Sequence, residues 1–158
     1  MPRVSKNHRY KFKKKPPEGF LNIEPALNSF AEKMKEAERQ PLEVNKRKYE
    51  STWKITMLHH QRSRYIYDLY YKRKLISRKL YDWLLLNKFA DKELIAKWKK
   101  KGYEKLCCLQ CIQVKNTNQQ TTCICRVPKA SLKAKGDDEQ GKSVRCKNCG
   151  CRGCASTD

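Results

Sequence analysis

The sequence predicts a mainly α-helical protein with an irregular, cysteine-rich C-terminal domain and a basic, disordered N-terminal arm. Three observations support this. Apolar residues recur at helical spacing between positions 21 and 106, all nine cysteines lie beyond position 106, and the first twenty residues carry seven Lys or Arg against one Glu. Because only 39% of the 158 residues are hydrophobic and 34% are charged, one large apolar core is not expected. The predicted regions are 1–20, 21–106 and 107–158.

The N-terminal arm contains a run of lysines followed directly by two prolines. This composition leaves no apolar face to bury, which predicts disorder. The same lysines are a candidate nuclear-import signal and a candidate phosphate-binding arm. They are Lys11, Lys13, Lys14 and Lys15.

A first helix is expected from Pro25 to Arg39. Proline suits the first helical position, and Pro41 would end the helix. The apolar residues at helical spacing are Leu27, Phe30, Met34 and Ala37.

A second, longer helix is expected from about Glu50 to Lys74, with apolar and aromatic residues on two opposite faces. Such a helix must be covered on both sides, and the chain offers few other apolar residues. We therefore infer that partner molecules cover one face; the alternative is that the other helices of the chain enclose it. One face carries Trp53, Met57, His60, Arg64, Tyr67 and Tyr71, and the other Ile55, Leu58, Arg62, Tyr65, Ile66 and Leu69.

Two short helices should follow. Ser77 is a suitable N-cap for a helix that ends near Phe89, and Asp91 is one for a helix over 92–101. Gly102 is expected to end the last helix. His59 and His60 are adjacent on the long helix and point in different directions, so they are expected to pack or to contact RNA rather than to form a paired ligand set.

The net charge of +21 indicates a polyanionic partner, RNA or DNA. Residues 51–106 contribute fifteen basic and five acidic residues. The alternative, a merely soluble lysine-rich surface, usually mixes both signs. Basic residues interleaved with tyrosines allow phosphate pairing and base stacking together. The candidate RNA-binding residues are Arg62, Arg64, Lys72, Arg73, Lys74, Lys97, Lys99, Lys100 and Lys101.

The cysteine spacing predicts zinc. It reads CC-x2-C, then C-x-C, then C-x2-C-x-C-x2-C, and tight turns of this kind bring two thiolates to one metal. No apolar run is long enough for a membrane span, and the basic N-terminus lacks the apolar stretch of a secretory signal. A reducing compartment is therefore expected, where metal ligation is favoured over disulfides. The candidate ligands are Cys107, Cys108, Cys111, Cys123, Cys125, Cys146, Cys149, Cys151 and Cys154.

Nine thiolates fill the coordination shells of three tetrahedral zinc ions if three sulfurs each bridge two metals. Two separate four-cysteine sites would leave one thiol over. We favour the trinuclear cluster because it uses every cysteine. An iron–sulfur cluster does not account for nine cysteines, and the odd count disfavours disulfides.

The expected zinc is structural, and no enzymatic activity or small-molecule substrate is predicted. A catalytic zinc keeps an open position and has a general base nearby. The nearest acidic residues, Asp137, Asp138 and Glu139, lie midway along a polar loop. The sequence contains no phosphate-binding glycine loop and no nucleophile motif.

Four segments carry a resemblance to a known family: HHQRSRYIYDLYYKRKLIS (59–77), ADKELIAKWKKKGYEKLCCLQCIQ (90–113), CICRVPK (123–129) and CKNCGCRGC (146–154). Together they resemble the bud-site-selection splicing factor family, also called the G-ten family. The similarity extends from PPEGF (16–20) to the C-terminus and departs from the family pattern in 40–50 and 130–145.

The resemblance implies a nuclear, non-enzymatic subunit of the spliceosome whose nine cysteines bind three zinc ions. It implies association with the nineteen complex-associated proteins and contacts with small nuclear RNA and large scaffold proteins near the catalytic core. Pre-mRNA is a further candidate partner.

Two other functional classes stay open. A DNA-binding zinc regulator shares the basic, cysteine-rich composition, but its recognition helix would follow the zinc cluster, and only four residues follow Cys154. A zinc enzyme would need a metal with an open coordination position.

Overall fold

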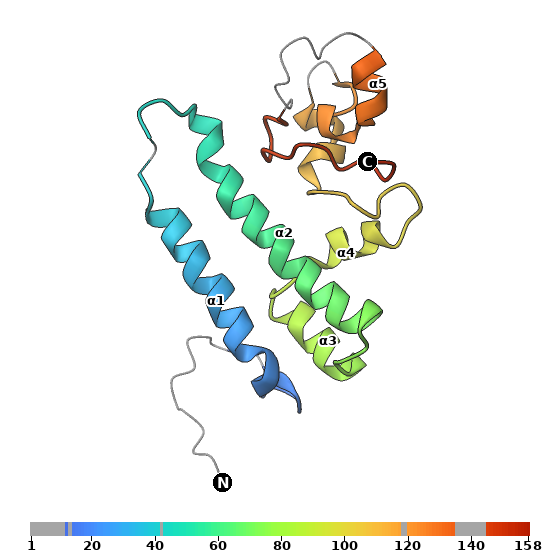
Figure 1. Cartoon of the computed structure of the whole chain (residues 1–158). Coiled ribbons are helices and arrows are strands. Elements are labelled where there is room, and N and C mark those ends of the chain that lie inside the picture. Colours follow the sequence, from blue (N-terminus) through green and yellow to red (C-terminus); the bar gives the residue numbers. More distant parts are fainter. Residues whose placement is uncertain (1–11, 13, 42, 118–119, 135–144) are drawn as a thin grey trace.

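The computed structural model describes residues 12, 14–41, 43–117, 120–134 and 145–158. These residues form helices and turns, with no β-strand among them. Helices α1 and α2 run side by side, α3 and α4 follow near the C-terminal end of α2, and the cysteine-rich segment lies beside its N-terminal half (Figure 1). The α-helices are α1 (Phe20–Arg39), α2 (Trp53–Tyr67), α3 (Arg78–Leu86), α4 (Lys92–Trp98) and α5 (Lys129–Ala134). The shorter helical turns are η1 (Lys48–Thr52), η2 (Asp68–Lys72), η3 (Gln110–Ile112), η4 (Val114–Asn116) and η6 (Ile124–Arg126).

Helix α1 begins at Phe20, five residues before the predicted start at Pro25. Gly19 precedes it with a φ of 88°, a conformation that glycine adopts at little cost. Phe20, Ile23 and Leu27 share one face and are buried at 1%, 6% and 0% exposure, so the apolar repeat extends N-terminally through the proline. Burial of that face outweighs the one backbone hydrogen bond that a proline inside a helix cannot make. The predicted end at Arg39 is confirmed.

The long helix is continuous from η1 through α2 to η2, that is, from Lys48 to Lys72. On one face Leu58 and Ile66 are buried, and Tyr65 lies 6.0 Å from the ring of Phe30 in α1. On the other face His60 lies 5.3 Å from the ring of Trp98 in α4. Other helices of the chain therefore enclose part of both faces, in line with the alternative of intramolecular enclosure. Met57 on the second face is 50% exposed, so cover of that part of the face by a partner molecule stays a prediction.

The caps of α3 and α4 confirm the predicted N-termini. Ser77 Oγ accepts a hydrogen bond from the N–H of Leu80 at 3.2 Å. Asp91 Oδ1 accepts from the N–H groups of Glu93 and Leu94 at 3.0 and 3.1 Å. Both helices end three residues earlier than expected, α3 at Leu86 and α4 at Trp98.

Tight turns account for these early ends. The N–H of Lys100 bonds to the carbonyl of Lys97, an i to i+3 contact that closes α4 before the predicted stop. Gly102 follows with a φ of 87°, as expected for a terminator. The N–H of Phe89 likewise returns to the carbonyl of Leu84 beyond the end of α3.

The described part of the N-terminal region packs on the helices. The ring of Phe12 lies 5.6 Å from Phe20 and 4.9 Å from Trp83, and Trp83 Nε1 donates to the carbonyl of Lys14 at 3.0 Å. The lysine run did not predict this contact. Lys11 and Lys13 of the candidate import signal lie outside the described residues, whereas Lys14 and Lys15 are exposed.

One continuous core joins the helices to the cysteine-rich segment. It runs from Phe20 in α1 through Leu84 and Trp98 to Cys154. Leu106, directly before the first cysteine, is fully buried, and its carbonyl accepts from Trp98 Nε1 at 2.8 Å. None of the helices in the described part of the chain has the length and hydropathy needed to cross a membrane.

Candidate metal centre

Short turns place the cysteines around a common interior. Cys111 and Cys125 lie in the helical turns η3 and η6. In the last knuckle the N–H of Gly150 bonds to the carbonyl of Cys146 at 2.8 Å, and Gly150 has a φ of 70°, which favours glycine. The N–H of Cys154 bonds to the carbonyl of Cys125 at 2.7 Å, so the knuckle is held to η6. The backbone turns therefore direct nine thiols inward.

The nine sulfurs divide into three groups of four whose atoms lie within 4.8 Å of one another. Three cysteines belong to two groups each, namely Cys107, Cys111 and Cys125. Every other cysteine belongs to one group. The groups are Cys107, Cys108, Cys111 and Cys149; Cys107, Cys125, Cys151 and Cys154; and Cys111, Cys123, Cys125 and Cys146.

The sulfur separations match tetrahedral metal sites. The sulfur pairs in direct contact lie between 3.2 Å, for Cys123 and Cys146, and 3.8 Å, for Cys107 and Cys125, and all sulfurs of one group lie within 4.8 Å of one another. Four sulfurs at about 2.3 Å from a zinc ion lie about 3.8 Å from each other. A disulfide would need about 2.05 Å, and all nine cysteines are free. The donor set is compatible with zinc.

The thiols perturb one another strongly. The hydrogen bond between Cys107 and Cys108 raises the pKa of Cys107 and lowers the pKa of Cys108. Bonds to neighbouring cysteines similarly raise the pKa of Cys125 and lower that of Cys146. Thiols this close cannot all ionise without cations among them. A bound metal ion supplies that charge and favours the thiolate form.

Arg126 supports the sulfur cluster from one side. One Nη atom donates to the carbonyl of Cys154 at 2.6 Å and contacts its sulfur at 3.5 Å. The other donates to the carbonyl of Gly102 at 2.6 Å, and the guanidinium lies 5.0 Å from the ring centroid of Tyr103. Burial lowers the pKa of Arg126, but the hydrogen bond to Cys154 and the charges of Cys154, Cys125 and Cys107 together raise that pKa above its ordinary value. The sequence placed Arg126 beside a ligand cysteine, but it did not predict the link to Gly102.

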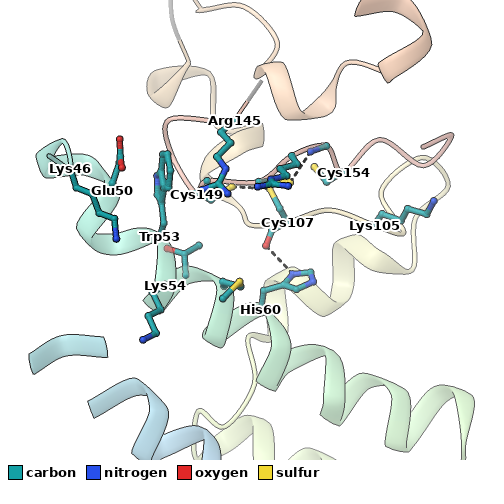
Figure 2. Close-up of a pocket in the computed structure, with 16 residues that line it drawn as sticks. Lys46, Glu50, Trp53, Lys54, His60, Lys105, Cys107, Arg145, Cys149 and Cys154 are labelled. Carbon is teal, nitrogen blue, oxygen red and sulfur yellow. Dashed lines mark hydrogen bonds between the residues drawn. The ribbon is translucent and has the colours of Figure 1, made fainter. Parts of the chain in front are cut away.

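Two side chains of α2 fix the metal centre to the helices (Figure 2). His60 Nδ1 lies 3.0 Å from the carbonyl oxygen of Cys107. Trp53 Nε1 donates to the carbonyl of Lys147 at 2.9 Å, and its ring lies so close to Gly150 that a Cβ there would come within 2.5 Å of it. Sequence reasoning missed both contacts, because the partners are 47 and 94 residues apart and no local pattern links them.

The two histidines diverge, as predicted. His60 is directed at the sulfur cluster, whereas His59 Nε2 lies 3.7 Å from Asp91 Oδ2. Burial, and then the charge of Arg64, lower the pKa of His60. The neutral imidazole is therefore the favoured form inside the fold.

The candidate RNA-binding arginines of α2 make contacts within the chain. Arg64 donates to the carbonyl of Glu104 at 3.0 Å, and its guanidinium lies 4.9 Å from the ring centroids of both Tyr67 and Trp98. Arg62 donates to the carbonyl of Lys88 at 3.3 Å.

The candidate lysines lie closer to solvent. Lys99 sits 4.5 Å over the ring of Tyr71, and Lys72 pairs with Asp68 at 3.3 Å. Lys97 lies 5.8 Å from the ring of Tyr103. The remaining candidates are exposed, namely Arg73, Lys74, Lys100 and Lys101.

Comparison with known proteins gives consistent matches over the whole chain. The family model described as pre-mRNA-splicing factor BUD31 matches residues 1–156. Protein BUD31 homolog of Danio rerio is 54% identical over 155 residues, which are 98% of this chain and 99% of the relative. Pre-mRNA-splicing factor BUD31 of Saccharomyces cerevisiae is 53% identical over 161 residues, with both chains fully covered. Pre-mRNA-splicing factor cwf14 of Schizosaccharomyces pombe is 54% identical over 145 residues, covering 92% of this chain and 94% of the relative.

Proposed function

The chain belongs to the family of pre-mRNA-splicing factor BUD31, and on that premise we propose that it is a structural, non-catalytic subunit of the spliceosome that acts in the nucleus. Relatives that match nearly end to end are named as pre-mRNA-splicing factors, which supports a role in splicing.

The nine cysteines bind three zinc ions in one cluster. The observation that carries this is the division of the sulfurs into three quartets with three shared members. Cys107, Cys111 and Cys125 each bridge two metals, and every metal has two further ligands of its own. All four positions of each ion are then filled by sulfur, which is the pattern of a structural zinc site. The zinc supplies the cross-links that fold the cysteine-rich segment.

The cluster is anionic and is balanced by nearby cations. Three Zn²⁺ and nine thiolates carry a net charge of about −3. Arg126 contacts the cluster directly, through the sulfur and carbonyl of Cys154. Metal-bound thiolates need such donors around them, because a buried charge without partners is costly. The protein with this cluster bound stays strongly basic, because the chain itself has a net charge of +21.

The basic surface binds small nuclear RNA and scaffold proteins near the catalytic core, with the nineteen complex-associated proteins and pre-mRNA among its surroundings. The charge of +21 supports an RNA partner. The exposed cations that follow α2 and α4 are the phosphate contacts, and those already engaged within the chain, above all Arg64, hold the fold. Phosphate contacts carry no base information, so recognition depends on RNA shape and context.

Affinity purification of the tagged chain from nuclei tests this function. The associated nucleic acids are sequenced and the associated proteins identified by mass spectrometry. We expect spliceosomal small nuclear RNAs and large spliceosomal proteins to be enriched, with salt-sensitive retention of the RNA. Enrichment of a duplex DNA motif without these RNAs would instead support the transcription-regulator class.

A further inference from the structure

A cavity of about 620 Å³ lies between the start of the long helix and the last cysteine knuckle (Figure 2). Its helical wall includes Trp53, Lys54 and Met57, and the opposite wall is formed by Arg145 and the segment 149–154. The volume falls within the range of about 300–1,000 Å³ that is typical of sites for small ligands. Neither the candidate RNA-binding residues nor the metal centre accounts for this outer part of the cavity.

The cavity rim is cationic. Five Lys or Arg side chains line the cavity against one carboxylate, that of Glu50. Lys54 Nζ donates to the neutral amide oxygen of Gln40 at 3.0 Å. Within the described part of the chain, Lys54, Arg145 and Arg152 have no carboxylate at ion-pair distance. Cations left without acidic partners around one cavity favour an anionic ligand.

One wall of the cavity is aromatic and apolar. Trp53 is half-buried there, whereas Trp83 and Trp98 are 6% and 1% exposed in the core. The guanidinium of Arg145 lies 5.8 Å from the ring centroid of Trp53. Met57 lines the same wall and is 50% exposed. An aromatic ring beside a guanidinium plane is the combination on which unpaired bases stack.

The cysteines that line the cavity disfavour a ligand that carries negative charge alone. Two of them, Cys107 and Cys151, are half-buried. Metal-bound thiolates repel carboxylates and phosphates, and they accept hydrogen bonds from N–H groups. A nucleotide fits both the sulfur atoms and the cationic rim. Its base can face inward toward the sulfurs while its phosphates stay at the rim. The side chains of an acidic peptide offer only acceptors to these sulfurs, and they carry no flat ring to stack on Trp53.

We propose that this cavity binds a nucleotide of single-stranded RNA. The base lies against Trp53 and Arg145, and the flanking phosphates contact Lys54 and Arg152. This inference rests on the proposed function for the identity of the polyanion, and it adds a site that includes none of the sequence-predicted RNA-binding residues. The cavity exists only when the cysteine knuckle is folded against the helix, so metal binding and RNA binding at this site are coupled.

Fluorescence anisotropy with the zinc-loaded full chain tests the site. The probe is a labelled single-stranded RNA of mixed sequence, about twelve nucleotides long, a length chosen to span one such site with its flanks. The cavity variant is Lys54→Gln with Arg145→Gln, neither of which is a metal ligand. The matched control, Lys79→Gln with Lys92→Gln, removes the same charge from exposed positions of α3 and the start of α4. Metal content and circular dichroism establish that both variants are folded.

We expect the cavity variant to weaken RNA binding roughly tenfold, through one lost phosphate contact at Lys54 and lost base stacking at Arg145. The slope of log K against log salt should fall by about 0.7, the value for one phosphate contact on a single strand. The control variant should stay within about twofold of the wild type. Equal losses in the two variants, or no loss in either, would overturn the site while leaving RNA binding elsewhere on the protein intact.

Photocrosslinking with a 4-thiouridine RNA provides the independent readout. Adducts are expected in the peptides around Trp53 and around Arg145 to Arg152. Adducts confined to Lys97–Lys101 would place the RNA elsewhere and contradict the inference. If poly-glutamate displaces the RNA at lower charge concentration than poly-uridine does, the occupant is an acidic protein. If the wild type binds no RNA at all, both this inference and the RNA-binding part of the proposed function fail.

Discussion

The helical region and the cysteine-rich region of this chain acquire their structure by different means. In the helices, side chains such as Leu27, Leu84 and Trp98 are almost fully buried and pack as in any apolar core. Beyond Leu106, the buried side chains are mainly cysteines, and the backbone consists of turns and short helical segments. Turns of this kind bury too little apolar area to stay folded alone. With the proposed zinc ions bound, one small chain would divide its stability between apolar packing in the helices and sulfur–metal bonds beyond Leu106.

Removal of the metal should affect the two regions most differently. A chelator is expected to unfold residues 107–158 while most of the helical circular dichroism remains, because structural zinc contributes on the order of 10 kcal/mol to the folding of small domains. Hydrogen exchange followed by mass spectrometry measures this peptide by peptide. We expect protection to disappear in the cysteine-rich peptides and to persist in α1 and α3. Uniform protection across the chain after chelation would contradict the division.

The next largest effect separates bridging from terminal cysteines. Cys107→Ser removes a sulfur that belongs to two quartets, whereas Cys108→Ser removes one that belongs to a single quartet. We expect the bridging variant to lose at least one more zinc ion per chain than the terminal variant, as measured by metal analysis of the purified proteins. The two cysteines are adjacent, so they form a matched pair. Equal metal content in the two variants would argue against shared ligands.

A core substitution in α3 should destabilise the helical region without affecting the metal centre. Leu84 is 0% exposed, and Leu84→Ala should reduce the free energy of unfolding by about 3 kcal/mol through lost burial and a cavity. Because the damage lies in the apolar core, the zinc content should not change. Denaturant unfolding and metal analysis of the same preparation check both parts. A variant that loses zinc while its helices stay stable would show that the regions are not organised separately.

The smallest predicted effect concerns the joint between the two regions. Gly150 and Gly102 both have positive φ, but a Cβ on Gly150 would meet the ring of Trp53 at 2.5 Å, whereas one on Gly102 would meet nothing within 4 Å. Gly102→Ala should therefore cost about 1 kcal/mol from backbone strain alone. Gly150→Ala should cost about 1–2 kcal/mol more, because the indole must move. Thermal unfolding compares the two, and similar losses would mean that Trp53 does not hold the joint.

Local sequence patterns predicted the positions of the helices better than they predicted which residues pack on them. Ser77 and Asp91 were recognisable as caps because a capping side chain acts within three residues. Pro25 misled the prediction of the first helix, since tertiary burial of Phe20 outweighs the signal from the proline. The cover of the long helix depends on contacts such as Trp53 with Lys147, which no local spacing reveals.

The metal centre shows the same limit. The count of nine cysteines favours three shared sulfurs, because three tetrahedral zinc ions would then use every cysteine. Which ones are shared depends on the three-dimensional path of the backbone. Cys111 and Cys125 lie in the helical turns η3 and η6, whereas Cys107 lies in irregular backbone, and only the fold brings each of them into two groups of four sulfurs.

Native mass spectrometry of the intact chain tests the central claim most directly, because it counts bound metals without assuming a ligand assignment. The account predicts a dominant species that carries three zinc ions per chain and no disulfide. A dominant species with two zinc ions would leave one cysteine outside any site and would contradict the shared-sulfur cluster.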